Sequence, residues 1–153
     1  GRVSVVRDYE MHVAKWLFRA VDVWMNLPRV PREASGTSGM KAALNFVPQF
    51  GTMDGWWAEG YNGSNGWAIP LAPDLDDPDD WAWNHTFDLL ENDVVPLFYE
   101  RTGSGIPMGW VDMMKQSLWV AGRDFTTGRM LREYATKFYV DAMAGGEGDD
   151  PPG

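Results

Sequence analysis

The sequence predicts an α/β fold in which a parallel, Rossmann-like sheet is followed by helices. Up to residue 69, short β-branched or aromatic runs alternate with stretches of helical periodicity, which is typical of βαβ units. Beyond residue 78 the strand signals stop, and apolar residues recur at helical spacing. Together these two observations favour one domain with a sheet in its first half and helices in its second half.

The first predicted unit consists of a strand, a helix and a second strand. Residues 3–6 form a β-branched run between charged residues, which favours a short buried strand. Asp8 is a suitable N-cap for a helix over 9–20, and strand character returns over 21–25. Strands separated by a crossover helix are expected to lie parallel in one sheet.

The middle of the chain is predicted to form a loop, a helix and two further strands. Residues 26–32 contain two prolines and are expected to form an irregular loop at the end of a strand. A helix is expected over 40–45, with strands over 49–53 and 67–69. Four glycines make 55–66 a loop by composition.

Helical periodicity dominates the rest of the chain. A linker rich in proline and aspartate over 70–78 precedes helices predicted over 81–100, 110–121 and 129–143. Residues 144–153 combine glycine, acidic residues and proline, and we expect disorder there.

Composition excludes several classes of protein. The net charge is −9 and no Lys/Arg cluster occurs, so a nucleic-acid partner is not expected. The chain has no cysteine, which rules out disulfides and thiolate metal sites. His12 and His85 lack a second ligand at metal spacing, and the acidic run 74–80 lacks the pattern of a calcium loop, so no metal is expected. No apolar run is long enough to span a membrane, and a cytoplasmic protein is expected.

The most informative stretch is 33–45. Small residues from Ala34 to Gly39 lie where a loop leaving a parallel strand meets a helix start, a position whose N–H groups favour anions. Lys41 follows within about one helical turn. A P-loop is excluded because Met40 and Ala42 flank the lysine. Two interpretations of Lys41 stay open. It is either a cofactor lysine that forms an imine while the helix start binds a phosphate, or a purely structural lysine.

Residues 31–45 closely resemble the pyridoxal-phosphate segment of the α-glucan phosphorylase family. Segments 22–26, 54–63 and 65–69 resemble flanking segments of the same family. Three parts of the chain are similar to the shorter, bacterial-type branch of this family: the sequence of residues 35–41, the loop 56–63 and the helical half. The resemblance covers nearly the whole chain apart from the tail.

The resemblance implies the later half of a Rossmann-like C-terminal domain of the glycosyltransferase-B type, followed by C-terminal helices. Residues 1–73 would then be the cofactor-binding part, 74–144 the helical part of the same domain, and 145–153 a disordered tail. The chain begins with Gly1, followed at once by a strand-like run, so we expect a missing N-terminal part.

The resemblance also implies a set of cofactor-binding residues. Lys41 would be the catalytic lysine that forms the Schiff base with pyridoxal 5'-phosphate. Gly36, Thr37 and Ser38 would lie around the cofactor phosphate, and Tyr9 would line the cofactor pocket.

Substrate contacts are implied for the segment just before the helix. Glu33, Ala34, Ser35 and Gly36 would contact the glucosyl unit, with Glu33 accepting hydrogen bonds from its hydroxyls. The family's cofactor phosphate acts beside inorganic phosphate as a proton relay, and glucose 1-phosphate is released from terminal α-1,4-glucosyl units with retained configuration. The chain would therefore be a transferase of glycogen degradation, with α-1,4-glucan and inorganic phosphate as its substrates.

Activity of the chain on its own is not expected. The family's lysine and arginine that bind the substrate phosphate come from earlier sequence, in the missing N-terminal part. The alternative is a catalytically inactive cofactor- or glucan-binding module of the same ancestry, or a scaffold. A homo-oligomer is compatible with the sequence, which does not fix the oligomeric state.

Two further expectations concern aromatic residues. Phe46 stands where the family usually has glycine, which indicates a backbone position that a side chain resists. Trp56, Trp57 and Trp67 are suited to stack on sugars, although a structural role in anchoring the loop is favoured. Two other tryptophans, Trp16 and Trp24, are expected in the core.

Overall fold

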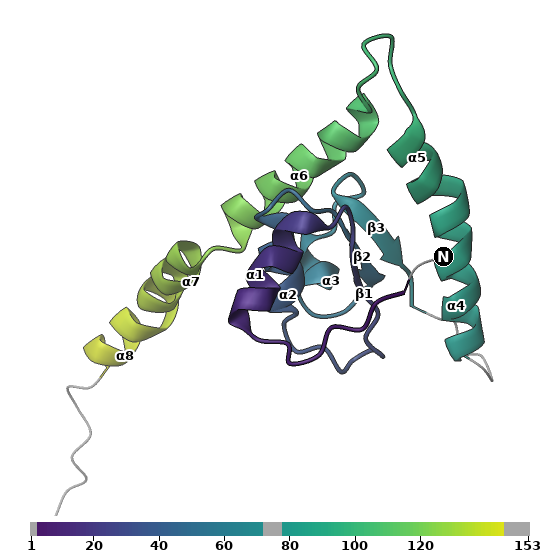
Figure 1. The fold of residues 1–153 in the computed structure, drawn as a ribbon. Helices are drawn as coiled ribbons and strands as arrows, with labels where there is room; N and C mark the ends of the chain where they lie inside the picture. Colours follow the sequence, from purple (N-terminus) through teal and green to yellow (C-terminus); the bar gives the residue numbers. More distant parts are fainter. Residues whose placement is uncertain (1–2, 72–77, 146–153) are drawn as a thin grey trace, which may run out of the picture.

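The computed structural model describes residues 3–71 and 78–145. Three short parallel strands form one sheet in the order β1-β2-β3, as Figure 1 shows. The strands are β1 (Trp24–Asn26), β2 (Gln49–Thr52) and β3 (Gly66–Ile69). The predicted α/β fold with a parallel sheet is therefore confirmed, while the details that define the glycosyltransferase-B type stay a prediction.

Helices surround the sheet and form the second half of the chain. Two π-helical stretches, Leu90–Val94 and Ala135–Tyr139, join α4 to α5 and α7 to α8 into continuous helices. The α-helices are α1 (Met11–Ala20), α2 (Thr37–Ala43), α3 (Trp56–Gly60), α4 (Pro78–Leu89), α5 (Val95–Tyr99), α6 (Met108–Asp124), α7 (Thr127–Tyr134) and α8 (Val140–Ala144).

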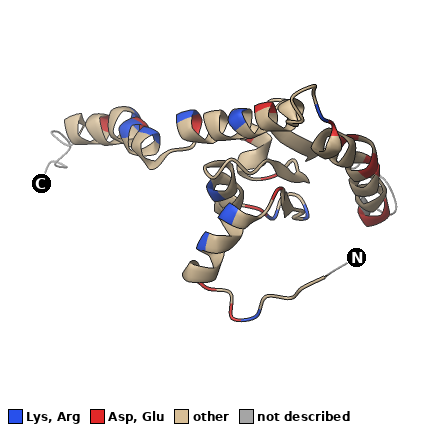
Figure 2. Cartoon of the chain, turned by 45° about the horizontal axis from the view of Figure 1, so that its top comes forward, with Lys and Arg blue, Asp and Glu red and all other residues tan. Residues whose placement is uncertain are grey.

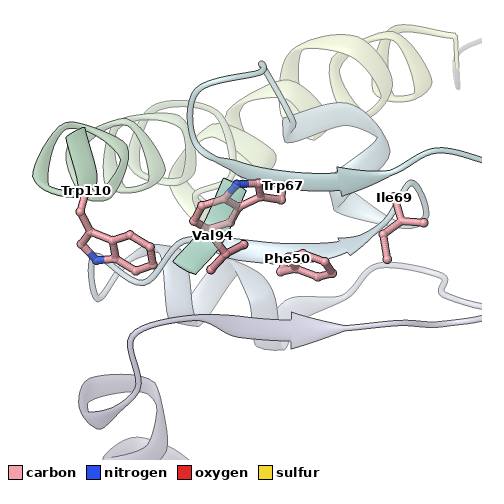
Figure 3. Packing of buried hydrophobic residues seen from close by; sticks show 5 residues of the cluster. All are labelled: Phe50, Trp67, Ile69, Val94 and Trp110. Carbon is pink, nitrogen blue, oxygen red and sulfur yellow. The ribbon is translucent and has the colours of Figure 1, made fainter. Parts of the chain in front are cut away.

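One face of the sheet packs on the helix that runs from α4 to α5. Phe50 pairs in register with Trp67, and Ile69 lies two residues further along β3 on the same face. These side chains meet Val94 and Trp110 in one buried cluster (Figure 3). Burial of each large apolar side chain contributes about 1.5–3 kcal/mol, so this cluster ties the helical half to the sheet.

The opposite face is covered by α2 and α3. Gln49 and Gly51 of β2 alternate with Phe50 and therefore face α2. A second buried cluster, Ala43, Trp56, Trp57 and Ala121, joins α2 and α3 to α6. A sheet covered by helices on both faces explains why its strands lack an alternating polar pattern.

The C-terminal helix from α7 to α8 extends away from the sheet, as Figure 1 shows. Its apolar side chains are largely exposed; Leu131 is 57% and Phe138 is 59% accessible. Several acidic residues lie on the helix from α4 to α5, and residues 78–100 contain no Lys or Arg (Figure 2).

The predicted strand over 3–6 is wrong. No described strand pairs with this segment, and Val3 and Val5 are 93% and 83% exposed. A single strand cannot bury its side chains or satisfy its backbone groups without a neighbour.

The first helix starts later than predicted. Its N-cap is Glu10, whose carboxylate accepts a hydrogen bond from Val13 N at 3.2 Å, whereas Asp8 lies two residues earlier with a φ of 52°. The prediction that Trp16 lies in the core is also wrong, because its side chain is 57% exposed. The buried stripe of α1 includes Ala14 and Phe18, and a residue two positions from Ala14 points to the other side of the helix.

Two predicted boundaries in the middle of the chain need correction. Helix α2 begins at Thr37, three residues before the predicted start, because the small residues are themselves helical. The predicted loop 55–66 contains α3, whose two tryptophans are buried. The predicted strands 49–53 and 67–69 and the helices of the second half are confirmed, with shifts at their ends. Most of the linker 70–78 and of the tail 144–153 lies outside the described residues.

Candidate functional site

The carboxyl ends of the three strands lie at one edge of the sheet because the strands are parallel. The loop after β1 leads through residues 27–36 into α2, and the loop 53–55 leads from β2 into α3. In open α/β sheets this edge is where ligands bind. All the predicted substrate-binding residues lie in the loop after β1, and the predicted cofactor-binding residues Thr37, Ser38 and Lys41 lie on α2, which follows it.

Glu33 is half-buried, whereas Ala34 and Ser35 are exposed. The backbone N–H of Glu33 donates to Asp54 Oδ2 at 2.9 Å, and Ser35 O accepts from Trp56 N at 2.6 Å. The segment is thus held at Glu33 by the loop after β2 and at Ser35 by the first residue of α3.

Gly36 is the N-cap of α2 and adopts a left-handed conformation, with φ 83° and ψ 42°. A Cβ at this position would lie 3.0 Å from Trp56 Cδ1, so both the backbone and the packing require glycine. No side chain caps the helix. Thr37 is exposed in the first turn, while Ser38 Oγ accepts a hydrogen bond from Trp24 Nε1 at 3.3 Å.

Lys41 is exposed in the last turn of α2. In residues 3–71 and 78–145 its ammonium group forms no ion pair, in contrast to Lys115 with Asp112 and Lys137 with Glu133. Lys15 is the other exposed lysine without an ion pair in these ranges, and it lies on α1. The Lys41 amine is therefore accessible to a reagent or cofactor.

The structure does not join Tyr9 to the residues around α2. Tyr9 lies in the segment before α1 with 56% of its surface exposed, and within the described part of the chain it makes no hydrogen bond. Its predicted contact with a cofactor stays a prediction.

The tryptophans predicted to anchor loops do so. Trp56 and Trp57 are 2% and 1% exposed, and Trp57 Nε1 donates to Trp67 O at 3.2 Å. Trp67 itself is buried against the helix from α4 to α5. None of these three rings offers an open face for a sugar, so the structural interpretation is confirmed. Trp24 is half-buried on Phe18, with ring centroids 4.7 Å apart.

Phe46 has a φ of 64° and is 45% exposed. The left-handed conformation costs roughly 1–2 kcal/mol for a residue with a side chain. The expectation that this position suits glycine is therefore confirmed by the backbone.

Sequence reasoning missed two residues that shape the site. Asp54 holds the loop before α2, and Gln49 accepts the indole N–H of Trp56 beneath it. The signal for Asp54 was present, since an acidic residue followed by glycine comes directly after a predicted strand at the ligand-binding edge. Gln49 gave no such signal, because its partner lies in a segment predicted to be a loop.

Other features of the described residues lie away from α2. A cavity of about 770 Å³ opens between the loop 27–32, the ends of β2 and β3, and α4, and none of the predicted site residues lines it. Across residues 3–71 and 78–145, no group of three or more His, Asp or Glu side chains is placed to hold a metal ion. None of the helices there is long and apolar enough to cross a membrane.

The fold and this edge define an α/β protein with a candidate ligand site at the carboxyl ends of a parallel sheet, and with an exposed lysine on the helix α2 that follows the first of its loops. Comparison with known proteins narrows this class. The chain is 45% identical over 139 residues to a glycogen phosphorylase of Aquifex aeolicus and 44% identical over 147 residues to a maltodextrin phosphorylase of Thermococcus litoralis. It is 42% identical over 144 residues to a glycogen phosphorylase of Mycobacterium tuberculosis.

These matches cover 91%, 94% and 92% of this chain, respectively. By sequence the chain is therefore a homologue of one part of the glycogen and maltodextrin phosphorylases, as the resemblance predicted. It spans 20% of the length of the first relative and 17% of each of the other two. No family model matches the chain.

Proposed function

We propose that the chain is the cofactor-bearing part of an α-glucan phosphorylase, a glycosyltransferase that uses inorganic phosphate to release glucose 1-phosphate from terminal α-1,4-glucosyl units. One observation carries the proposal. Lys41, an exposed lysine that forms no ion pair with any residue the structure describes, lies one turn beyond the helix start after Gly36 in a chain 42–45% identical to phosphorylases.

The residues present fit pyridoxal 5'-phosphate. The start of α2 after Gly36 has no side-chain cap, and Thr37, which follows Gly36, is exposed. These residues and Ser38 would hold the cofactor phosphate through N–H and hydroxyl donors. The Lys41 amine would hold the cofactor covalently. The bound cofactor supplies a phosphate group that passes a proton to and from the substrate phosphate.

The substrate side of the proposal concerns the loop before α2. Glu33 would accept hydrogen bonds from sugar hydroxyls, while Ala34, Ser35 and Gly36 would contact the sugar through small side chains and backbone. A carboxylate orients a polyol well because it accepts from several hydroxyls at once. Tyr9 would line the cofactor pocket from the segment before α1.

The rest of the enzyme would come from a longer polypeptide. The chain would be the later part of a Rossmann-like domain of the glycosyltransferase-B type, and the groups that bind the substrate phosphate would lie outside these residues. The alternative is a catalytically inactive cofactor- or glucan-binding module, which the left-handed backbone of Phe46 favours because the position suits glycine.

A phosphorolysis assay tests the proposal. The longest polypeptide that carries this chain is supplied with maltodextrin, inorganic phosphate and pyridoxal phosphate, and glucose 1-phosphate is measured. We expect Lys41→Ala to abolish its formation and Lys15→Ala to leave it unchanged, because both lysines are exposed but only Lys41 lies on α2, the helix that begins after Gly36. The 153-residue chain alone is expected to form none. Equal activity of the two variants would refute the proposal.

A further inference from the structure

Asp54 connects two loops at the carboxyl edge of the sheet. Its Oδ2 accepts the N–H of Glu33 at 2.9 Å, and its Oδ1 accepts the N–H of Gly55 at 2.9 Å. Both carboxylate oxygens are thus used by backbone donors, one in the loop before α2 and one in the loop before α3. Hydrogen bonds to a charged acceptor are the stronger ones, so this side chain is well suited to fix the two loops together.

Two further contacts bring the same loops close together. Trp56 N donates to Ser35 O at 2.6 Å, which fastens the loop before α2 a second time, two residues after Glu33. A Cβ on Gly55 would lie 2.7 Å from Ser35 O and 2.9 Å from Glu33 Cγ, and its φ is 55°. Only glycine fits between the two loops.

The connection reaches the start of α2. A Cβ on Gly36 would lie 3.0 Å from Trp56 Cδ1 and 3.5 Å from Glu33 Oε1, so the residues held by Asp54 also form the wall beside Gly36. Trp56 is itself immobilised in the core, with its indole N–H donating to Gln49 Oε1 at 2.8 Å. Displacement of Glu33 would therefore change the surroundings of Gly36.

We propose that Asp54 is a positioning residue that fixes the segment from Glu33 to Gly36 relative to Lys41. It touches neither cofactor nor substrate and acts through the Glu33 N–H. This inference rests on the proposed function, because that function places the cofactor phosphate at Gly36–Ser38.

The test compares the attachment of pyridoxal phosphate and of pyridoxal to Lys41 in the longest polypeptide that carries this chain. Attachment is fixed by borohydride reduction and quantified at Lys41 by peptide mass spectrometry. Pyridoxal lacks the phosphate, so the ratio of the two apparent affinities reports the phosphate-holding segment alone. General destabilisation lowers both affinities equally and leaves their ratio unchanged.

The variants are Asp54→Asn and Thr52→Val. Asparagine has nearly the same shape but replaces one acceptor by a donor. Thr52→Val removes a different hydrogen bond at the same edge, from Thr52 Oγ1 to Pro28 O at 2.9 Å, and serves as the control for local destabilisation.

We expect Asp54→Asn to reduce the preference for pyridoxal phosphate about tenfold, the effect of losing one charge-assisted hydrogen bond, while Thr52→Val keeps it. An unchanged preference in Asp54→Asn, or an equal loss in Thr52→Val, overturns the role of Asp54 and leaves the proposed function standing. If the unaltered polypeptide shows no preference for pyridoxal phosphate at Lys41, the proposed function fails and the role of Asp54 fails with it.

Discussion

The indole N–H of Trp56 donates to Gln49 Oε1 at 2.8 Å in the space that a side chain on Gly39 would fill. A Cβ on Gly39 would lie 1.8 Å from Gln49 Oε1 and 2.6 Å from Trp56 Nε1. Helix α2 can therefore pack on β2 and α3 only because residue 39 has no side chain. This close packing fixes the helix that carries Lys41.

Substitution of Gly39 by alanine is expected to destabilise the chain by about 3 kcal/mol, from overpacking and a broken buried hydrogen bond. Gly122 is the matched control, because it is also helical and an added Cβ there meets nothing within 4 Å. Gly122→Ala should stabilise by about 0.5–1 kcal/mol through helix propensity. Urea unfolding followed by tryptophan fluorescence measures both, and equal midpoints for the two variants would contradict the packing described.

Replacement of Phe46 by glycine is expected to stabilise the chain by about 1 kcal/mol, because it relieves a left-handed conformation. Leu44 is the control, since it is 43% exposed, close to the 45% of Phe46, but has an ordinary φ of −65°. Leu44→Gly should destabilise by about 1 kcal/mol. The same urea titration decides the sign, and loss of stability in Phe46→Gly would show that its contacts outweigh the strain.

Glu133 gives the C-terminal helix an acid-sensitive contact. A hydrogen bond from Lys137, with a smaller contribution from Arg129, lowers the pKa of Glu133 below its ordinary value. A carboxylate with a lowered pKa stabilises the helix above its ordinary pKa of about 4.3, and that contribution is lost as the pH falls through the lowered value.

We therefore expect carbon-detected NMR to place the Glu133 titration below that of a free glutamate. Lys137→Met should move the pKa upward, because it removes the largest cause of the shift. Lys115→Met, which removes an ion pair on α6, should leave it in place. A Glu133 pKa that is the same in all three proteins would contradict the contact.

The features predicted from the sequence were those that depend on local patterns. The strands around Phe50 and Trp67 are confirmed because β-branched and aromatic runs between turn residues mark buried parallel strands. The peculiarity of Phe46 was visible because glycine is usual there in the family. The residues of segment 33–41 were found through motif resemblance, and their roles stay proposals.

What the sequence did not predict depends on contacts between distant segments. The valines of 3–6 have strand propensity but no neighbouring strand in the described chain, so propensity alone misled. Helix α3 was missed because the glycines around it are typical of a loop. Its two tryptophans are buried, and burial of side chains cannot be read from so short a segment. The position of Asp54 after a predicted strand was visible, but its role was not, because its partner, the backbone N–H of Glu33, lies 21 residues away and cannot be identified from the sequence.

The distribution of a cofactor label over the lysines tests the central claim most directly. The longest polypeptide that carries this chain is incubated with pyridoxal phosphate and reduced with borohydride, and the label is mapped on the four lysines of this chain by peptide mass spectrometry. The account predicts a label concentrated on Lys41, with Lys15, Lys115 and Lys137 nearly unlabelled. A label on Lys15 equal to that on Lys41 would mean that exposure alone governs the reaction, and would contradict a cofactor site at α2.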